Sequence, residues 1–179
     1  MEGVRFVQKI FVAGLLIVTG IIAGTWKSQQ LTRRYELLGK MIDGLSFMEN
    51  EIYYTRARLD MIARRVADMS EGDAAEFFRS FCEMMGNMEE RGAEELWYMA
   101  ADESFCWPTP LTDKDIEAVS VLGGRLGKTD VAGQCENIKR TCKELAIRRA
   151  EAKADIEKKG RLYKTIGAAA GAACAMLVI

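Results

Sequence analysis

The sequence contains no histidine, so it lacks the side chain that most often serves as a general base near neutral pH. Zinc sites that mix cysteine with histidine are excluded for the same reason. The five cysteines form no C-x-x-C pair, and Cys135 and Cys142, seven residues apart, have the spacing of small apolar core residues. We therefore predict no catalytic residue, no cofactor-binding residue and no metal site, and we expect no enzyme.

Proline is also scarce, because the only two, Pro108 and Pro110, lie close together and mark a single clear break. Elsewhere in the central region apolar residues recur with a period close to 3.6, and no alternating stretch indicates a strand. The charges nearly cancel, with 25 Lys and Arg against 26 Asp and Glu, which gives no support for a nucleic-acid partner. The sequence predicts an all-α protein.

Charge is absent from two stretches, and the first of these covers residues 10–26. With the apolar residues before it, this stretch reaches the roughly 17–25 residues that a helix needs to cross a bilayer. We predict a transmembrane anchor over residues 1–27. A cleaved signal peptide is the alternative, since Arg5 and Lys9 form a short basic start, although the apolar run is long for a signal core.

The second uncharged stretch, residues 165–179, is still apolar at Ile179. We predict a second transmembrane anchor that is incomplete at its C-terminus, and a buried helix of a soluble protein is the alternative. Gly167 and Gly171 form a G-x-x-x-G pattern, which lets two membrane helices approach closely. These two glycines are candidate helix-packing residues, for self-dimerisation or for contact with another helix.

Basic residues flank both uncharged stretches on their inner side. Because Lys and Arg near a membrane end tend to stay in the cytoplasm, residues 28–164 are expected to form one cytoplasmic domain. The bilayer itself is an expected partner, since a basic side chain near anionic lipid gains about 1 kcal/mol. The membrane-proximal basic residues are Lys158, Lys159, Arg161 and Lys164.

Within residues 28–164 the apolar pattern predicts a bundle of about five to six helices. Helices are expected over residues 31–55, from Leu59 to about Val66, from Asp73, over residues 93–101, and from Thr112. Asp73 followed by Glu76 resembles a capping box, and Thr112 followed by Asp115 is expected to open the fifth helix. The last helix is expected to start at Val131 after a cap at Thr129 or Asp130. It is expected to continue into the second anchor, because no breaker stronger than Gly160 intervenes.

A glycine-rich loop separates the fifth and sixth expected helices. It ends in Gly127, Lys128 and Thr129, which match the tail of a phosphate-binding loop. The full motif needs glycine at position 122, where Leu122 stands, and no strand precedes the loop. A sensor of a phosphorylated ligand is therefore only an alternative function.

Acidic residues gather in one part of the central region. This stretch is either a solvated surface or a docking site for a partner. It comprises Glu89, Glu90, Glu94, Glu95, Asp102 and Glu103.

Nearly all of the chain resembles the stage III sporulation protein AB family of endospore-forming bacteria. Four segments carry the resemblance: SFMENEIYY, RLDMIARRV, LGGRLGKTDVAGQ and KKGRLYKTIGAAAG. The most specific element is the family's L-G-x-[S/T]-D-x-x-x-Q pattern. Leu126, Gly127, Asp130 and Gln134 match it, and we take these four as candidate structural or interaction residues.

The resemblance implies a non-enzymatic helical bundle similar to the cytoplasmic domain of type II secretion platform proteins, the F family. The implied location is the mother-cell membrane around the forespore, in a secretion-like channel that links the two cells. The implied partners are a cytoplasmic secretion-type ATPase and other membrane subunits of the same complex. A passive membrane-anchored scaffold is the alternative. The chain departs from the family in lacking a proline after the first anchor and a T-P-L turn before RLDMIARRV.

Overall fold

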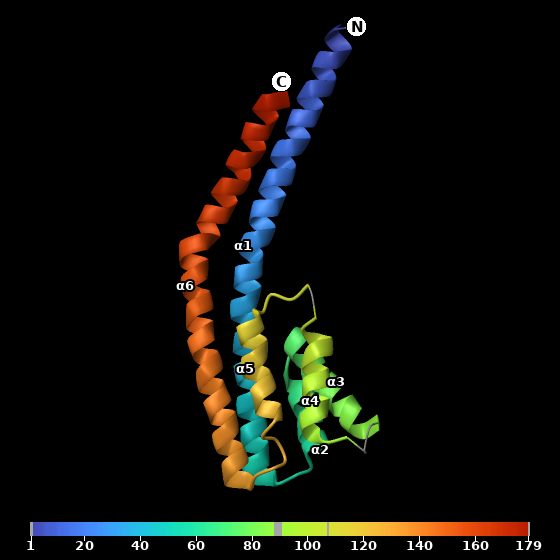
Figure 1. Cartoon of the computed structure of the whole chain (residues 1–179), viewed down its shortest axis with the longest axis vertical. Coiled ribbons are helices and arrows are strands. Elements are labelled where there is room, and N and C mark those ends of the chain that lie inside the picture. The colour runs from blue at the N-terminus through green and yellow to red at the C-terminus, as the bar shows by residue number, and fades with distance from the viewer. Residues whose placement is uncertain (1, 88–90, 107, 179) are drawn as a thin grey trace. The chain divides into compact units, whose positions relative to one another are not determined.

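The computed structural model describes residues 2–87, 91–106 and 108–178, and these residues form six helices and no strand. The predicted all-α fold is confirmed (Figure 1). The helices are α1 (Glu2–Thr55), α2 (Leu59–Met69), α3 (Asp73–Asn87), α4 (Ala93–Ser104), α5 (Asp113–Gly123) and α6 (Val131–Val178).

The chain divides into two compact units. We call Arg34–Ala150 the helical domain, and Met1–Arg33 together with Glu151–Ile179 the terminal pair. Each of the two long helices, α1 and α6, contributes residues to both units. The predicted continuation of the last helix from Val131 into the C-terminal apolar stretch is confirmed.

In the terminal pair, α1 provides the one candidate membrane span among the described helices. Only 11% of its apolar window is buried, whereas the core helix of a soluble protein would be mostly buried. Trp26, half exposed near the end of this segment, suits a membrane interface, where its ring and N–H meet different surroundings. The apolar end of α6 does not meet the same criterion over the described residues, so a second span remains a prediction.

The two helices of the terminal pair meet through glycine. A Cβ atom added to Gly24 of α1 would lie 2.5 Å from the carbonyl oxygen of Tyr163 in α6. Gly20 and Gly167 likewise leave no room for a Cβ on either helix, because each faces the other's carbonyl oxygen. The G-x-x-x-G pattern that ends at Gly171 thus lies against α1 of the same chain, and the backbones approach closely.

The helical domain contains an aromatic core built by α3, α4 and the segment after α4. Trp97 is fully buried, with the ring of Phe77 edge-on at 4.7 Å, and Phe105 stacks on Phe77 at 5.2 Å. The Trp97 Nε1 group donates a hydrogen bond to the carbonyl oxygen of Val119 in α5 (2.9 Å), which satisfies its buried donor. A Cβ on Gly123 would lie 2.5 Å from the Trp97 ring, so glycine lets α5 approach α4.

Large aliphatic side chains of α1 form a buried stripe in this domain, and α6 packs beside it. Cys135 is buried, with its Sγ 3.8 Å from the carbonyl oxygen of Glu49, and the Cys142 Sγ lies 3.9 Å from the Ile42 carbonyl. Residues at spacings of three and four therefore face one neighbouring helix. The fully buried members of the α1 stripe are Leu38, Met41, Leu45 and Met48.

The helix starts include one wrong prediction. The sequence suggests a capping box from Asp73 to Glu76, but Asp73 is already the first residue of α3. Gly72 precedes it with φ of +60°, a conformation that glycine adopts without strain, and its carbonyl accepts from the Glu76 amide. The capping box is formed instead at α5, between Thr112 and Asp115.

Candidate interaction surfaces

The turn between α5 and α6 contains the family pattern. Leu126 is 3% exposed, and its amide donates to carbonyl groups at the end of α5. Gly127 has φ of +73°, a left-handed conformation that residues with a Cβ rarely adopt. The helix α5 itself ends at Gly123, so these two residues lie in the turn after it and redirect the chain.

Asp130 and Gln134 build the start of α6. The Asp130 Oδ1 atom accepts a hydrogen bond from the Gly133 amide (3.0 Å), which is the geometry of a helix cap. The Gln134 Nε2 group donates to the carbonyl oxygen of Thr129 (3.1 Å). All four pattern residues thus have structural contacts inside one turn.

The alternative phosphate-loop hypothesis finds little support in this geometry. The Lys128 ammonium group pairs with the Glu94 carboxylate of α4, so it is directed at a protein anion. The N-terminus of α6, where a phosphate would bind, is occupied by the Asp130 carboxylate. The loop therefore connects helices rather than presenting a free anion site.

An ion pair inside the helical domain joins α1 to α5. The Arg34 Nε and Nη2 atoms donate to the two carboxylate oxygens of Asp115, at 2.7 and 2.9 Å. The Asp115 side chain is fully buried, and that of Arg34 is 10% exposed. The Thr112 amide donates to the same carboxylate (2.8 Å), so a single buried acid caps α5 and holds α1.

Burial by itself raises the pKa of Asp115, but hydrogen bonds from Arg34 and Thr112 outweigh it, and the pKa lies below its ordinary value. Asp115 is therefore ionised at neutral pH and has a structural role. Arg34 lies in the basic flank that follows the first uncharged stretch, and its pairing with Asp115 is not predicted from the sequence. The available signal was its register, since Arg34 falls on the same helical face as Leu38 and Met41.

A second arginine, Arg149 of α6, is held by contacts with α1. The Arg149 guanidinium lies over the Tyr35 ring, 4.5 Å from its centre, in a cation–π contact. A Cβ on Gly39 would lie 2.8 Å from the same guanidinium, so glycine makes room for it. Arg149, which interrupts the apolar pattern of α6, thus packs against α1 in the helical domain.

The helices α5 and α6 border a groove of about 460 Å³, which we call the α5–α6 groove. Two exposed aliphatic side chains, Val121 and Ile147, line it. Two acidic residues, Glu117 and Glu144, also line it. Its basic residues are Lys114, Arg125, Arg140, Lys143 and Arg148. The groove therefore combines apolar surface with an excess of positive charge.

The membrane-proximal basic residues lie on the part of α6 that belongs to the terminal pair. All four, Lys158, Lys159, Arg161 and Lys164, are exposed. Lys159 forms an ion pair with Asp155 one turn earlier, at 2.7 Å. The other faces of this segment remain available to solvent or to anionic groups.

Three of the thiols, one buried and two partly buried, are poorly suited to nucleophilic chemistry. Burial is the main cause that raises the pKa of Cys82, Cys135 and Cys142 above the ordinary thiol value. Among the residues that the structure describes, no cluster of three or more acidic or thiol side chains is arranged to hold a metal ion.

These features describe a class of protein: an all-α chain with a candidate membrane span and a helical domain that presents a charged groove. The comparisons identify the family. The family model for Stage III sporulation protein AB matches residues 9–179, so this chain belongs to that family and has a sporulation-related role. The predicted family resemblance is confirmed.

A solved structure described as Stage III sporulation protein AB (SpoIIIAB) has a similar fold. The TM-score is 0.63 at 20% sequence identity, and the match covers 69% of this chain and 96% of that chain. At this identity the likeness concerns the fold. The comparison with curated proteins gave no match.

Proposed function

We propose that this protein is a non-enzymatic assembly subunit of a secretion-like sporulation complex in the mother-cell membrane around the forespore. Its helical domain docks the cytoplasmic secretion-type ATPase of that complex. Its apolar helix ends contact other membrane subunits. Membership of the sporulation family supports the biological setting. The ATPase as partner rests on the expected relation of that family to the secretion platform proteins of the F family.

The observation that carries the proposal is the continuity of the two long helices. Both α1 and α6 form part of the helical domain, and each continues as an unbroken helix into the terminal pair. A binding event on the domain therefore acts on helices that also contain the apolar segments. A platform subunit needs this connection, whereas a passive anchor would work equally well with a flexible linker.

Binding is tested by capture of the full chain, in detergent, with the sporulation ATPase, in the presence and absence of nucleotide. We expect specific, nucleotide-sensitive capture. If folded helical protein captures no ATPase under either condition, the docking proposal is wrong and a scaffold that acts through its membrane segments takes its place.

Helix continuity is tested separately by inserting four glycines after Arg33, at the boundary of the two units. We expect ATPase capture to persist, because the helical domain is intact, while sporulation fails. The matched control places the same four glycines after Arg56, in the loop between α1 and α2, where no helix is interrupted. Normal sporulation with the insertion after Arg33 would favour the passive anchor.

A further inference from the structure

The α5–α6 groove contains basic groups that the domain leaves without partners. Lys114, Arg140 and Lys143 form no ion pair with any residue that the structure describes. The Arg148 Nη2 group binds Glu144 at 2.7 Å, but its Nε atom is buried without a hydrogen-bond partner. The exposed cations without an ion-pair partner therefore suit the groove to an incoming acidic group.

The apolar part of the groove favours a protein surface over a small anion. Val121 is 46% exposed and Ile147 is 59% exposed. A partner that fits must combine an apolar side chain with flanking carboxylates, because it meets aliphatic surface surrounded by cations.

One exposed face of α4 has this composition. Glu95, Tyr98 and Asp102 are spaced three and four residues apart, so they share one helical face. The Tyr98 side chain is 42% exposed and lies between the two acids. Glu95 pairs with Arg91 at 2.5 Å, while Asp102 has no ion-pair partner within the described ranges. We call these three residues the α4 acidic face.

Charge is segregated in the sequence as well. Residues 73–106, which contain α3 and α4, carry nine acidic and two basic residues. Residues 131–150, the part of α6 in the helical domain, carry two acidic and five basic residues. The segment with α3 and α4 is thus acidic and this part of α6 is basic, which favours association of copies in an oriented manner.

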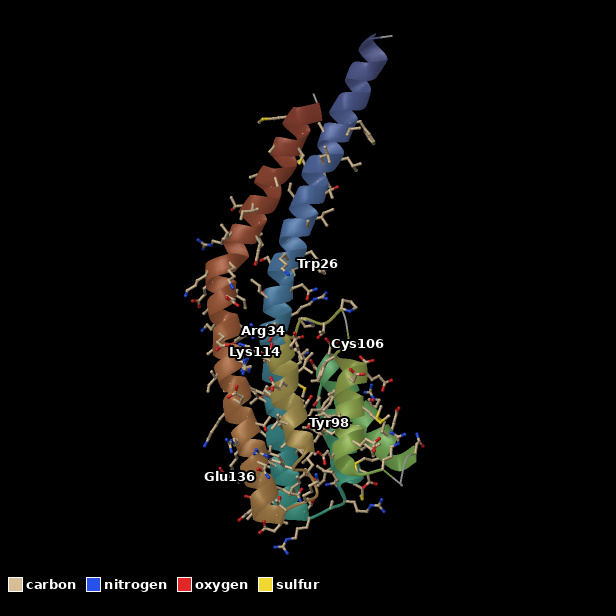
Figure 2. All side chains as sticks on the ribbon, viewed as in Figure 1. Trp26, Arg34, Tyr98, Cys106, Lys114 and Glu136 are labelled. Atoms are coloured by element: carbon tan, nitrogen blue, oxygen red, sulfur yellow. The ribbon has the colours of Figure 1, made fainter. Side chains whose placement is uncertain are left out.

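We propose that copies of this protein associate through unlike faces, with the α4 acidic face of one copy in the α5–α6 groove of the next. The two surfaces belong to different helices, because α5 packs on α4 and borders the groove with α6 (Figures 1 and 2). Figure 2 labels Tyr98 on α4 and Lys114 on α5.

A contact between unlike faces leaves one groove and one acidic face free at the two ends of a pair. Further copies therefore extend the assembly into a ring or an open row. Anchoring in a membrane would raise the effective concentration of copies and strengthen a weak contact. This inference does not depend on ATPase docking.

The test uses the full chain in detergent, with sedimentation velocity and energy transfer between differently labelled copies. The groove variant carries Arg140→Glu and Lys143→Glu. The face variant carries Glu95→Lys and Asp102→Lys. We expect the wild type to associate more weakly as salt rises, and each variant to associate about tenfold more weakly or worse, because like charges then meet.

The decisive sample combines both sets of substitutions in one chain. Reversing both faces restores opposite charges across the contact, so self-association is expected to return, which a folding defect would not produce. Mixing the groove variant with the face variant is also expected to restore energy transfer. The charge-matched control, Arg64→Glu with Arg79→Glu, changes exposed residues of α2 and α3 outside both surfaces and is expected to associate like wild type.

Three results would overturn the proposal. The first is a wild type that remains monomeric at every concentration tested. The second is association of both single-surface variants as strong as that of the wild type. The third is a combined chain that has a normal helical circular dichroism spectrum but does not recover association.

Discussion

The same two helices, α1 and α6, pack in different ways in the two units. In the terminal pair they meet through glycines such as Gly24 and Gly167, and backbone atoms approach closely. In the helical domain they meet through large side chains and sulfur atoms, with Met41 fully buried on α1 and Cys135 buried on α6. The difference agrees with the predicted membrane anchors, since lipid offers helices little hydrophobic gain and rewards close approach, while water rewards the burial of large apolar side chains.

The largest expected effect is in the helical domain. Asp115→Ala removes the carboxylate that binds the buried Arg34 guanidinium and is expected to lower the free energy of unfolding by about 3–5 kcal/mol. Denaturant unfolding of the full chain in detergent, followed by circular dichroism, measures the change.

Two controls refine this result. Asp113→Ala, at an exposed neighbour in the first turn of α5, is expected to cost less than about 0.5 kcal/mol. The double variant Arg34→Met with Asp115→Leu replaces the pair by apolar side chains and is expected to recover much of the loss. A loss below about 1 kcal/mol for Asp115→Ala would show that the pair is not a main link between α1 and α5.

The next effect belongs to the terminal pair. Gly24→Val introduces a branched side chain at a position where a Cβ atom alone would lie 2.5 Å from a backbone oxygen. The two helices must therefore separate, at an expected cost of about 1–3 kcal/mol. The measurement is the efficiency of a cysteine cross-link between the two helices in detergent. Gly14→Val is the matched control, because a Cβ there has no neighbour within 4 Å. Equal cross-linking in both variants would contradict close glycine packing.

A smaller effect is expected at the family pattern. Asp130→Ala removes the cap of α6 and is expected to destabilise the domain by about 0.5–2 kcal/mol. Asp130→Asn keeps an accepting oxygen and is expected to stay close to wild type in the same unfolding experiment. Unchanged stability of Asp130→Ala together with lost complex assembly would instead assign Asp130 to partner contact.

The smallest expected effect is a pH dependence of the stability of the helical domain. The folded pKa of Asp115 lies below its unfolded value, so its stabilisation is fully present above an ordinary Asp pKa of about 3.9. It is lost as the pH falls further, through the lowered folded pKa. The difference in unfolding free energy between wild type and Asp115→Asn should therefore shrink below about pH 4. A constant difference across that range would show that Asp115 is not the titrating group.

Much of the fold follows from local pattern. The buried stripe that includes Leu38 and Leu45 follows from spacing of three and four residues, and Thr112 marks the start of α5. The pattern cannot identify which polar residues meet across helices. Arg34 and Asp115 are 81 residues apart, and only their registers on α1 and α5 hint at a meeting.

The interaction surfaces were harder to predict than the helices. The acidic residues around Glu95 are visible in the sequence, but the basic groove requires α5 and α6 to lie side by side. The sequence predicts Gly167 and Gly171 as packing residues, and no such prediction was made for Gly20 and Gly24. Their shared role depends on a contact between helices that are far apart in sequence.

The sequence by itself determined the helical class, the apolar stretches and the family, because these depend on composition, periodicity and short motifs along the chain. Only the tertiary structure decided that Arg34 is held by Asp115, that the glycines of α6 lie against α1, and that cations of two helices surround one groove. The physical reason is that such contacts join residues distant in sequence, whose meeting is fixed by the packing of whole helices rather than by any local preference.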